Sequence, residues 1–86
     1  MINMAMINFD SSDWDSICDT INKVNEIDEL QYGKTSDDED IIFDVCKDEY
    51  GNNCLKTDVF QSDGWIRTNI YNPTWYSIDE FYKKDR

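Results

Sequence analysis

Carboxylates are the reactive groups that dominate this 86-residue chain. Nineteen Asp and Glu stand against eight Lys and Arg, and there is no histidine, so the formal net charge is −11. General acid–base catalysis near neutral pH usually relies on histidine or on a carboxylate of raised pKa, and no lone acid lies within an apolar run. Nucleophile, phosphate-loop and dinucleotide motifs are also missing from the sequence. We therefore expect a protein that is not an enzyme and uses no cofactor.

Three cysteines are the remaining candidates for chemistry: Cys18, Cys46 and Cys54. Their number is odd, no Cys-x-x-Cys pair occurs, and no histidine completes a zinc site, so we expect reduced thiols in a cytoplasm. Cys18 falls on the apolar side of a predicted helix and is expected to be an inert core thiol. The acidic segments lack the ligand spacing and the glycine of an EF-hand, so no metal site is predicted.

Length and composition predict one small folded domain covering residues 1–86. Apolar residues make up 40% of the chain and aromatic residues 14%, which is too many for a disordered acidic tail. Residues 1–8 could be a short edge strand or a translated leader, because methionines at positions 1, 4 and 6 each could be the start. No apolar stretch reaches the length of a membrane span and no basic segment precedes the first apolar residues, so a cytoplasmic location is expected.

An amphipathic helix is predicted from Ser11 to about Ile27. Apolar residues recur there at steps of three and four, and Ser12 is a candidate N-cap. Three carboxylates fall in a row on the opposite, solvent-facing side: Asp15, Asp19 and Glu26. The helix is followed by an acidic loop at residues 34–40, predicted to be exposed and mobile because Thr35 to Asp40 include no apolar residue.

Residues 41–71 read as three antiparallel strands, at 41–47, 53–60 and 65–71, with turns near Gly51 and Gly64. Placing Val45 opposite Leu55, and Val59 opposite Ile66, puts the apolar residues of both hairpins on one face. The segment 76–83 alternates like a fourth strand, although Ser77 and Glu80 could instead form a helix capping box; we favour the strand.

These elements predict an α+β domain in two layers, with one helix packed on a three- to four-stranded antiparallel meander. The predicted core is Trp14, Ile17, Ile21, Val24, Phe43, Val45, Leu55, Val59, Ile66 and Ile70. The outer sheet face would then carry polar and aromatic side chains, and it is a candidate secondary interface, through which the chain could also form a small homo-oligomer: Asp44, Asp58, Trp65 and Tyr71.

Charge is unevenly distributed along the chain. Residues 1–64 hold sixteen acids and four lysines, a balance of −12, whereas residues 65–86 have a balance of +1. Such a surface repels nucleic acid and membranes and attracts basic protein grooves that hold nucleic acid. The candidate partner-binding residues are therefore those of the helix row and the adjoining loop: Asp15, Asp19, Glu26, Asp37, Asp38, Glu39 and Asp40.

In size, charge and expected architecture, the chain resembles the small acidic inhibitors that phages make against host nucleases and repair enzymes, such as anti-CRISPR proteins and uracil-DNA glycosylase inhibitors. The resemblance implies host-defence evasion by occupying a basic groove of a nuclease or Cas effector, without direct nucleic-acid binding. An immunity protein or antitoxin that neutralises a basic toxin would be equally acidic. The same composition would also suit a small metal-dependent enzyme with clustered carboxylates, or an acidic domain that has no partner.

Overall fold

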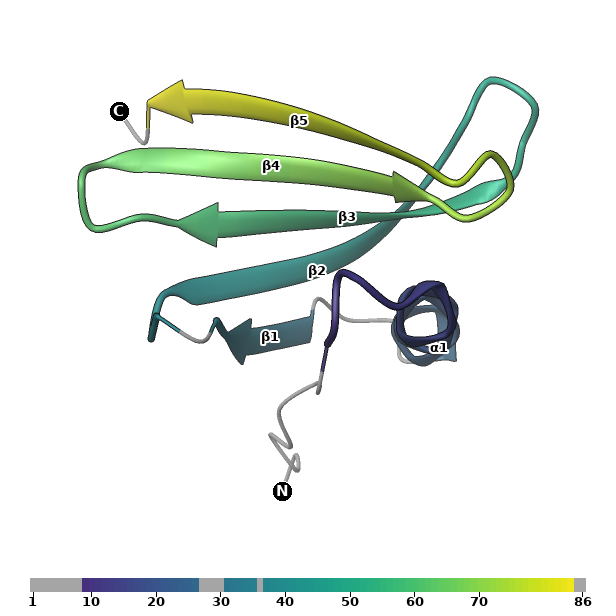
Figure 1. Cartoon of the computed structure of the whole chain (residues 1–86), viewed down its shortest axis with the longest axis horizontal. Helices are drawn as coiled ribbons and strands as arrows, with labels where there is room; N and C mark the ends of the chain where they lie inside the picture. The colour runs from purple at the N-terminus through teal and green to yellow at the C-terminus, as the bar shows by residue number, and fades with distance from the viewer. Residues whose placement is uncertain (1–8, 27–30, 36, 85–86) are drawn as a thin grey trace.

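The residues that the structure describes fold into one helix and a five-stranded antiparallel sheet (Figure 1). The computed structural model describes residues 9–26, 31–35 and 37–84. The elements are α1 (Trp14–Glu26), β1 (Gln31–Lys34), β2 (Asp40–Lys47), β3 (Asn53–Phe60), β4 (Trp65–Asn72) and β5 (Ser77–Lys84). The strands lie in the sheet in chain order, as in a meander. The predicted two-layer α+β class is confirmed, with five strands instead of three or four.

Helix α1 begins one residue later than a Ser12 cap would require. Asp13 is the N-cap, because its Oδ1 accepts a hydrogen bond of 3.0 Å from the backbone N–H of Asp15. The Ser12 hydroxyl instead donates to Oδ1 of Asp10, at 2.7 Å. The prediction of Ser12 as the cap is therefore wrong. The predicted strand or leader at residues 1–8 lies outside the described residues.

The buried side of α1 packs on β2 and β3 through Ile17, Thr20, Ile21 and Val24. These positions keep the spacing of three and four residues, whereas Cys18 lies about 100° around the helix from Ile17 and is exposed. The expectation of a core thiol at Cys18 is therefore wrong. Thr20 can be buried because its hydroxyl donates a hydrogen bond of 2.8 Å to the carbonyl of Ser16.

Register is predicted correctly in one central hairpin and incorrectly in the other. Val45 lies opposite Leu55 as expected, and the whole β2–β3 pairing follows. Val59 lies opposite Arg67 and not Ile66, so the β3–β4 pairing is displaced by one residue. The β3–β4 loop explains the displacement: the N–H of Gly64 donates to Gln61, and the N–H of Gln61 donates to Trp65.

Those bonds define a three-residue loop in which Gly64 has a φ of 87°. The β2–β3 loop has the same form, with Gly51 at a φ of 85° in the equivalent place. The predicted second hairpin implied a four-residue loop. Placing the glycine at the third position of a three-residue loop in both hairpins would have given both registers.

Compared with the predicted register, the one-residue displacement reverses which side chains of β4 face α1. Tyr71 is 4% exposed and joins the core, while Ile66 and Ile70 lie on the opposite face from α1. Trp14 and Val45, also predicted for the core, are half-buried against it together with Phe9. The buried cluster consists of Ile17, Ile21, Val24, Ile41, Phe43, Leu55, Val59 and Tyr71.

The two outer strands differ in length and exposure. β1, which the sequence did not predict, pairs with β2 over four residues, and a Cβ at Gly33 would lie only 3.2 Å from the Phe43 ring. β5 is a strand, as favoured, and all eight of its residues are exposed. In the part of the chain that the structure describes, no helix is long and apolar enough to cross a membrane.

Candidate partner-binding surface

The row of helix carboxylates lies on the exposed side of α1. Asp15, Asp19 and Glu26 are all exposed, while Ile17 and Ile21 on the other side are buried. With a rise of about 1.5 Å per residue, Asp15 and Asp19 are separated by about 6 Å along the axis, and Glu26 follows about 10 Å further on. Because the buried side fixes the helix to the sheet, the three carboxylates occupy defined positions.

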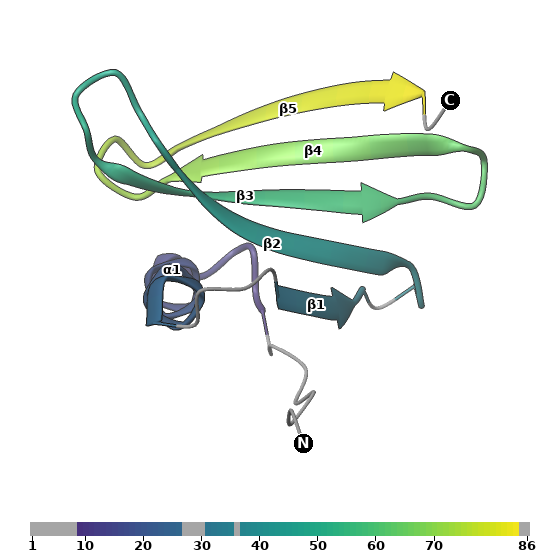
Figure 2. The same cartoon turned by 180° about the vertical axis from the view of Figure 1, so that it is seen from behind.

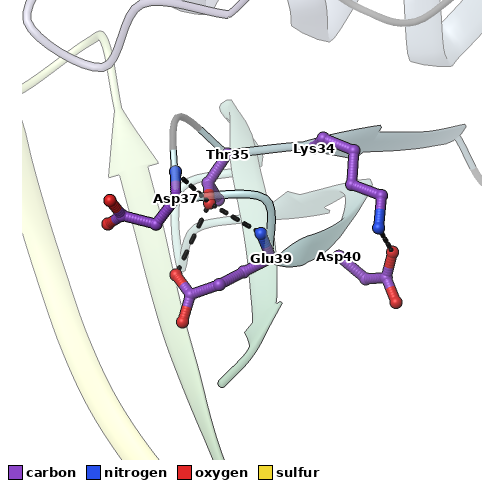
Figure 3. Close-up of polar contacts among 5 residues, drawn as sticks. All are labelled: Lys34, Thr35, Asp37, Glu39 and Asp40. Carbon is purple, nitrogen blue, oxygen red and sulfur yellow. Dashed lines mark hydrogen bonds and ion pairs between the residues drawn. The ribbon is translucent and has the colours of Figure 1, made fainter. Parts of the chain in front are cut away.

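The acidic segment between β1 and β2 is a hydrogen-bonded turn (Figure 3). The Thr35 hydroxyl oxygen accepts from the N–H groups of Asp37, at 3.3 Å, and Glu39, at 3.1 Å. The carbonyl of Thr35 accepts from Asp38, which has a φ of 63°. The predicted loop at 34–40 is thus shorter in the structure, because Lys34 and Asp40 are the paired ends of β1 and β2.

The carboxylates of this turn differ in how far their charge is offset. Nζ of Lys34 lies 2.7 Å from Oδ1 of Asp40, and this hydrogen bond raises the pKa of Lys34. Glu39 is half-buried, with Oε1 3.5 Å from the Thr35 hydroxyl. Asp37 and Asp38 are exposed. Asp37 and Asp38 are therefore the residues of the turn that present the most accessible negative charge.

The helix row and the acidic turn are two separate patches. Helix α1 lies beside the start of β1, and the β1–β2 turn lies at the other end of that strand (Figures 1 and 2). The helix row and the turn therefore do not form one continuous surface. A partner that contacts both patches must extend along β1.

A hollow of about 280 Å³ lies between the turn and the core on the helix side of the sheet. Phe43 and Tyr71 contribute aromatic walls, and Arg67, Asp37 and Glu39 contribute charges of both signs. The sequence did not predict this hollow, because the displaced register had placed Arg67 and Tyr71 on the other face. The position of Gly64 was the signal that could have located them.

The predicted secondary interface is not assembled on one face. Asp44 and Asp58 lie on the outer face, where Asp58 accepts a hydrogen bond of 2.6 Å from Thr68. Trp65 and Tyr71 belong to the helix side of β4, and Tyr71 is buried. Trp65 is half-buried, with Nζ of Lys84 4.5 Å from its ring centroid. The prediction that these four residues share an exposed face is wrong.

Asp48 lies outside both acidic patches and has its own hydrogen-bond partners. Partial burial tends to raise the pKa of Asp48, but hydrogen bonds from Asn52, Asn72 and Tyr50 outweigh it and lower this pKa to about 2. All three cysteines are free thiols, and burial raises the pKa of Cys46 and Cys54, which makes them poor nucleophiles. Within the described ranges, no group of three or more Cys, Asp or Glu side chains is placed to hold a metal ion.

Comparison with known proteins gives no family. No family model matches the chain, and neither a curated protein nor a solved structure is significantly similar to it. Function is therefore inferred from the surface described above and from its charge.

Proposed function

We propose that this chain is a stoichiometric protein inhibitor of a nucleic-acid-binding enzyme, and specifically an anti-CRISPR protein that acts in the host cytoplasm on a Cas effector. The helix row of Asp15, Asp19 and Glu26 is its principal contact. The supporting observation is that these three exposed carboxylates lie on a helix whose opposite side is anchored in the core.

The spacing of the row suits a groove that normally holds a phosphate backbone. Each strand of duplex DNA carries a phosphate about every 3.4 Å, so carboxylates about 6 and 10 Å apart coincide with a subset of phosphate positions. A helix already fixed to a sheet loses less conformational entropy on binding than a disordered acidic tail. Lysine and arginine side chains that line such a groove would pair with the row.

The β1–β2 turn supplies a second, weaker contact in this proposal. Asp37 and Asp38 are exposed, whereas the charge of Asp40 is offset by Lys34. The separation of the turn from α1 suits an elongated groove better than a compact pocket. A chain of net charge −11 should also associate rapidly with a basic partner and lose affinity as salt is added.

The proposal is tested by capture from host lysate on three forms of the immobilised protein. The first is the native chain, and the second carries Asp15→Lys and Asp19→Lys. The third carries Glu49→Lys and Asp63→Lys, which change the net charge equally in the exposed β2–β3 and β3–β4 turns. Bound proteins are eluted with increasing salt and identified by mass spectrometry.

We expect a Cas effector or nuclease on the native and turn-substituted forms and its loss from the helix-substituted form. Equal capture by all three forms would show that the helix row is not the contact. A captured toxin that is not a nucleic-acid enzyme would instead support the immunity-protein function. Circular dichroism of each form confirms that its fold is retained.

A further inference from the structure

Among the described strands, β5 is a long edge strand with one side that pairs with no other strand. The sheet order places β5 at the margin, and among the described strands it pairs only with β4. All eight residues from Ser77 to Lys84 are exposed. An edge strand of this length presents unpaired backbone N–H and C=O groups, which are a template for another strand.

Apolar side chains accompany this open edge. Ile78 and Phe81 are each 50% exposed, and Tyr82 is 55% exposed. The opposite edge of the sheet is formed by β1, which has only four residues and includes Gly33. A very short edge strand is a common protection against pairing with another chain, and the eight-residue β5 lacks this protection.

The two halves of β5 carry charges of opposite sign. Asp79 and Glu80 occupy the first half, and Lys83 and Lys84 occupy the second half. An antiparallel strand of the same sequence would therefore bring acidic residues opposite basic ones. The complementary partner for this edge is β5 itself.

We propose that two copies of this chain associate through antiparallel pairing of β5, with Phe81 opposite Phe81 of the second copy. In this register Asp79 lies opposite Lys83 on the outer face, and the two-fold axis repeats that pair on the other side of Phe81. On the helix side Glu80 lies opposite Tyr82, whose hydroxyl already donates to Glu80 within one chain, at 3.0 Å. The result is one continuous ten-stranded sheet.

Neighbouring registers are less favourable. Residues that lie opposite each other must have side chains on the same face of the sheet. In a symmetric antiparallel pair, the numbers of two opposite residues therefore add up to an even sum, which is 162 for the Phe81-centred register. The neighbouring registers have sums of 160 and 164. One such displacement places Glu80 opposite Glu80, and the other places Lys83 opposite Phe81. Like charges directly opposite each other destabilise a sheet, which disfavours the Glu80-centred register. The other displacement pairs Tyr82 with Tyr82 and Glu80 with Lys84, but it leaves the apolar Phe81 ring opposite the Lys83 ammonium group. The Phe81-centred register pairs Phe81 with Phe81 and gives both Asp79 carboxylates a Lys83 partner.

The proposal does not depend on the function proposed above, because β5 contains none of the residues assigned to the partner contact. The charge reversals at Asp79 and Lys83 that test the dimer also leave the helix row unchanged. A failure of dimerisation would therefore not bear on target binding, and a failure of target binding would not bear on the dimer.

A charge-exchange experiment tests both the interface and its register. Mass is measured by light scattering after gel filtration, over a range of concentrations, for the native chain, Asp79→Lys, Lys83→Asp and an equimolar mixture of these two variants. Glu49→Lys, in an exposed turn, is the matched control for Asp79→Lys. Thermal unfolding followed by circular dichroism verifies that each variant is folded.

We expect dimers for the native chain and for Glu49→Lys, with dimerisation weakened about tenfold in each single β5 variant because two ion pairs become repulsive. The mixture should recover a heterodimer, because each variant supplies the charge that the other needs opposite residues 79 and 83. A native chain that stays monomeric at every concentration would overturn the proposal. Dimers that persist unchanged in the single variants would also overturn it.

Discussion

The two acidic regions of this molecule are fixed in opposite ways. Helix α1 is held by distant parts of the chain, because Ile17, Ile21 and Val24 pack on β2 and β3. The β1–β2 turn is held locally, by hydrogen bonds between Thr35 and the residues that follow it. Carboxylates on α1 therefore depend on the integrity of the whole domain, whereas those on the turn depend on a few adjacent residues. Substitutions that affect only one of the two regions can test whether core packing holds the helix and local hydrogen bonds hold the turn.

The largest expected effect is at Ile17, which is 0% exposed beneath the helix row. Ile17→Ala should lower the free energy of unfolding by about 2–5 kcal/mol, because a buried side chain is replaced by a cavity. Urea unfolding followed by circular dichroism measures the loss. Asn22→Ala, on the exposed side of α1, is the control and should change stability little. A loss no greater than that of Asn22→Ala would mean that the core does not hold the helix.

A smaller effect is expected at Thr35, on the turn. Thr35→Ala removes the acceptor for the N–H groups of Asp37 and Glu39, which should cost about 0.5–1.5 kcal/mol. Thr35→Ser keeps the hydroxyl and should restore most of the loss in the same urea titration. If alanine and serine destabilise equally, the methyl group and not the hydrogen bonds supports the turn.

The β2–β3 turn extends this contrast, because Asp48 occupies the place that Thr35 occupies in the β1–β2 turn and accepts from Tyr50 and Asn52. Its pKa is lowered from 3.8 to about 2, so its contribution is complete above about pH 4 and is lost as the pH falls towards 2. The stability difference between the native chain and Asp48→Asn should be constant above pH 4 and shrink below it. The difference between native and Thr35→Ala should stay level across that window. A pH-independent Asp48→Asn difference would contradict the role given to the Asp48 carboxylate.

The smallest expected effect is a gain in stability at Asp38, whose φ of 63° is unfavourable for a residue with a side chain. Asp38→Gly should stabilise the turn by up to about 1 kcal/mol, because glycine adopts this conformation without steric cost. The equivalent places in the next two turns already hold glycine, at Gly51 and Gly64. Thermal unfolding measures the change, and a decrease in the midpoint would show that the carboxylate itself stabilises the turn.

The sequence predicted the elements in which side-chain pattern and local geometry agree. Helical spacing identified α1 and the exposed positions of Asp15, Asp19 and Glu26, and apolar alternation gave the β2–β3 register. In β4, both alternate sets contain apolar residues, so pattern alone did not distinguish the face of Ile66 and Ile70 from that of Tyr71. The loop decided the register, through the left-handed glycine at position 64.

Other errors arose where the sequence signal was short or ambiguous. The strand at Gln31–Lys34 has four residues and includes a glycine, and it was recognisable only from its pairing with β2. Burial of Thr20 in place of Cys18 required the hydrogen bond to Ser16, which composition does not reveal. The separation of the acidic turn from the helix followed from β1, so it could not be predicted without that strand.

Competition with nucleic acid is the sharpest test of the helix row as a mimic of a phosphate backbone. A fluorescent nucleic acid is bound to the effector captured from the lysate, and its displacement by the native chain and by Asp15→Lys/Asp19→Lys is followed by anisotropy. We expect displacement by the native chain, with an apparent affinity that weakens in proportion to the nucleic acid present, and little displacement by the variant. A stable complex holding both the chain and the nucleic acid would contradict the proposed mimicry.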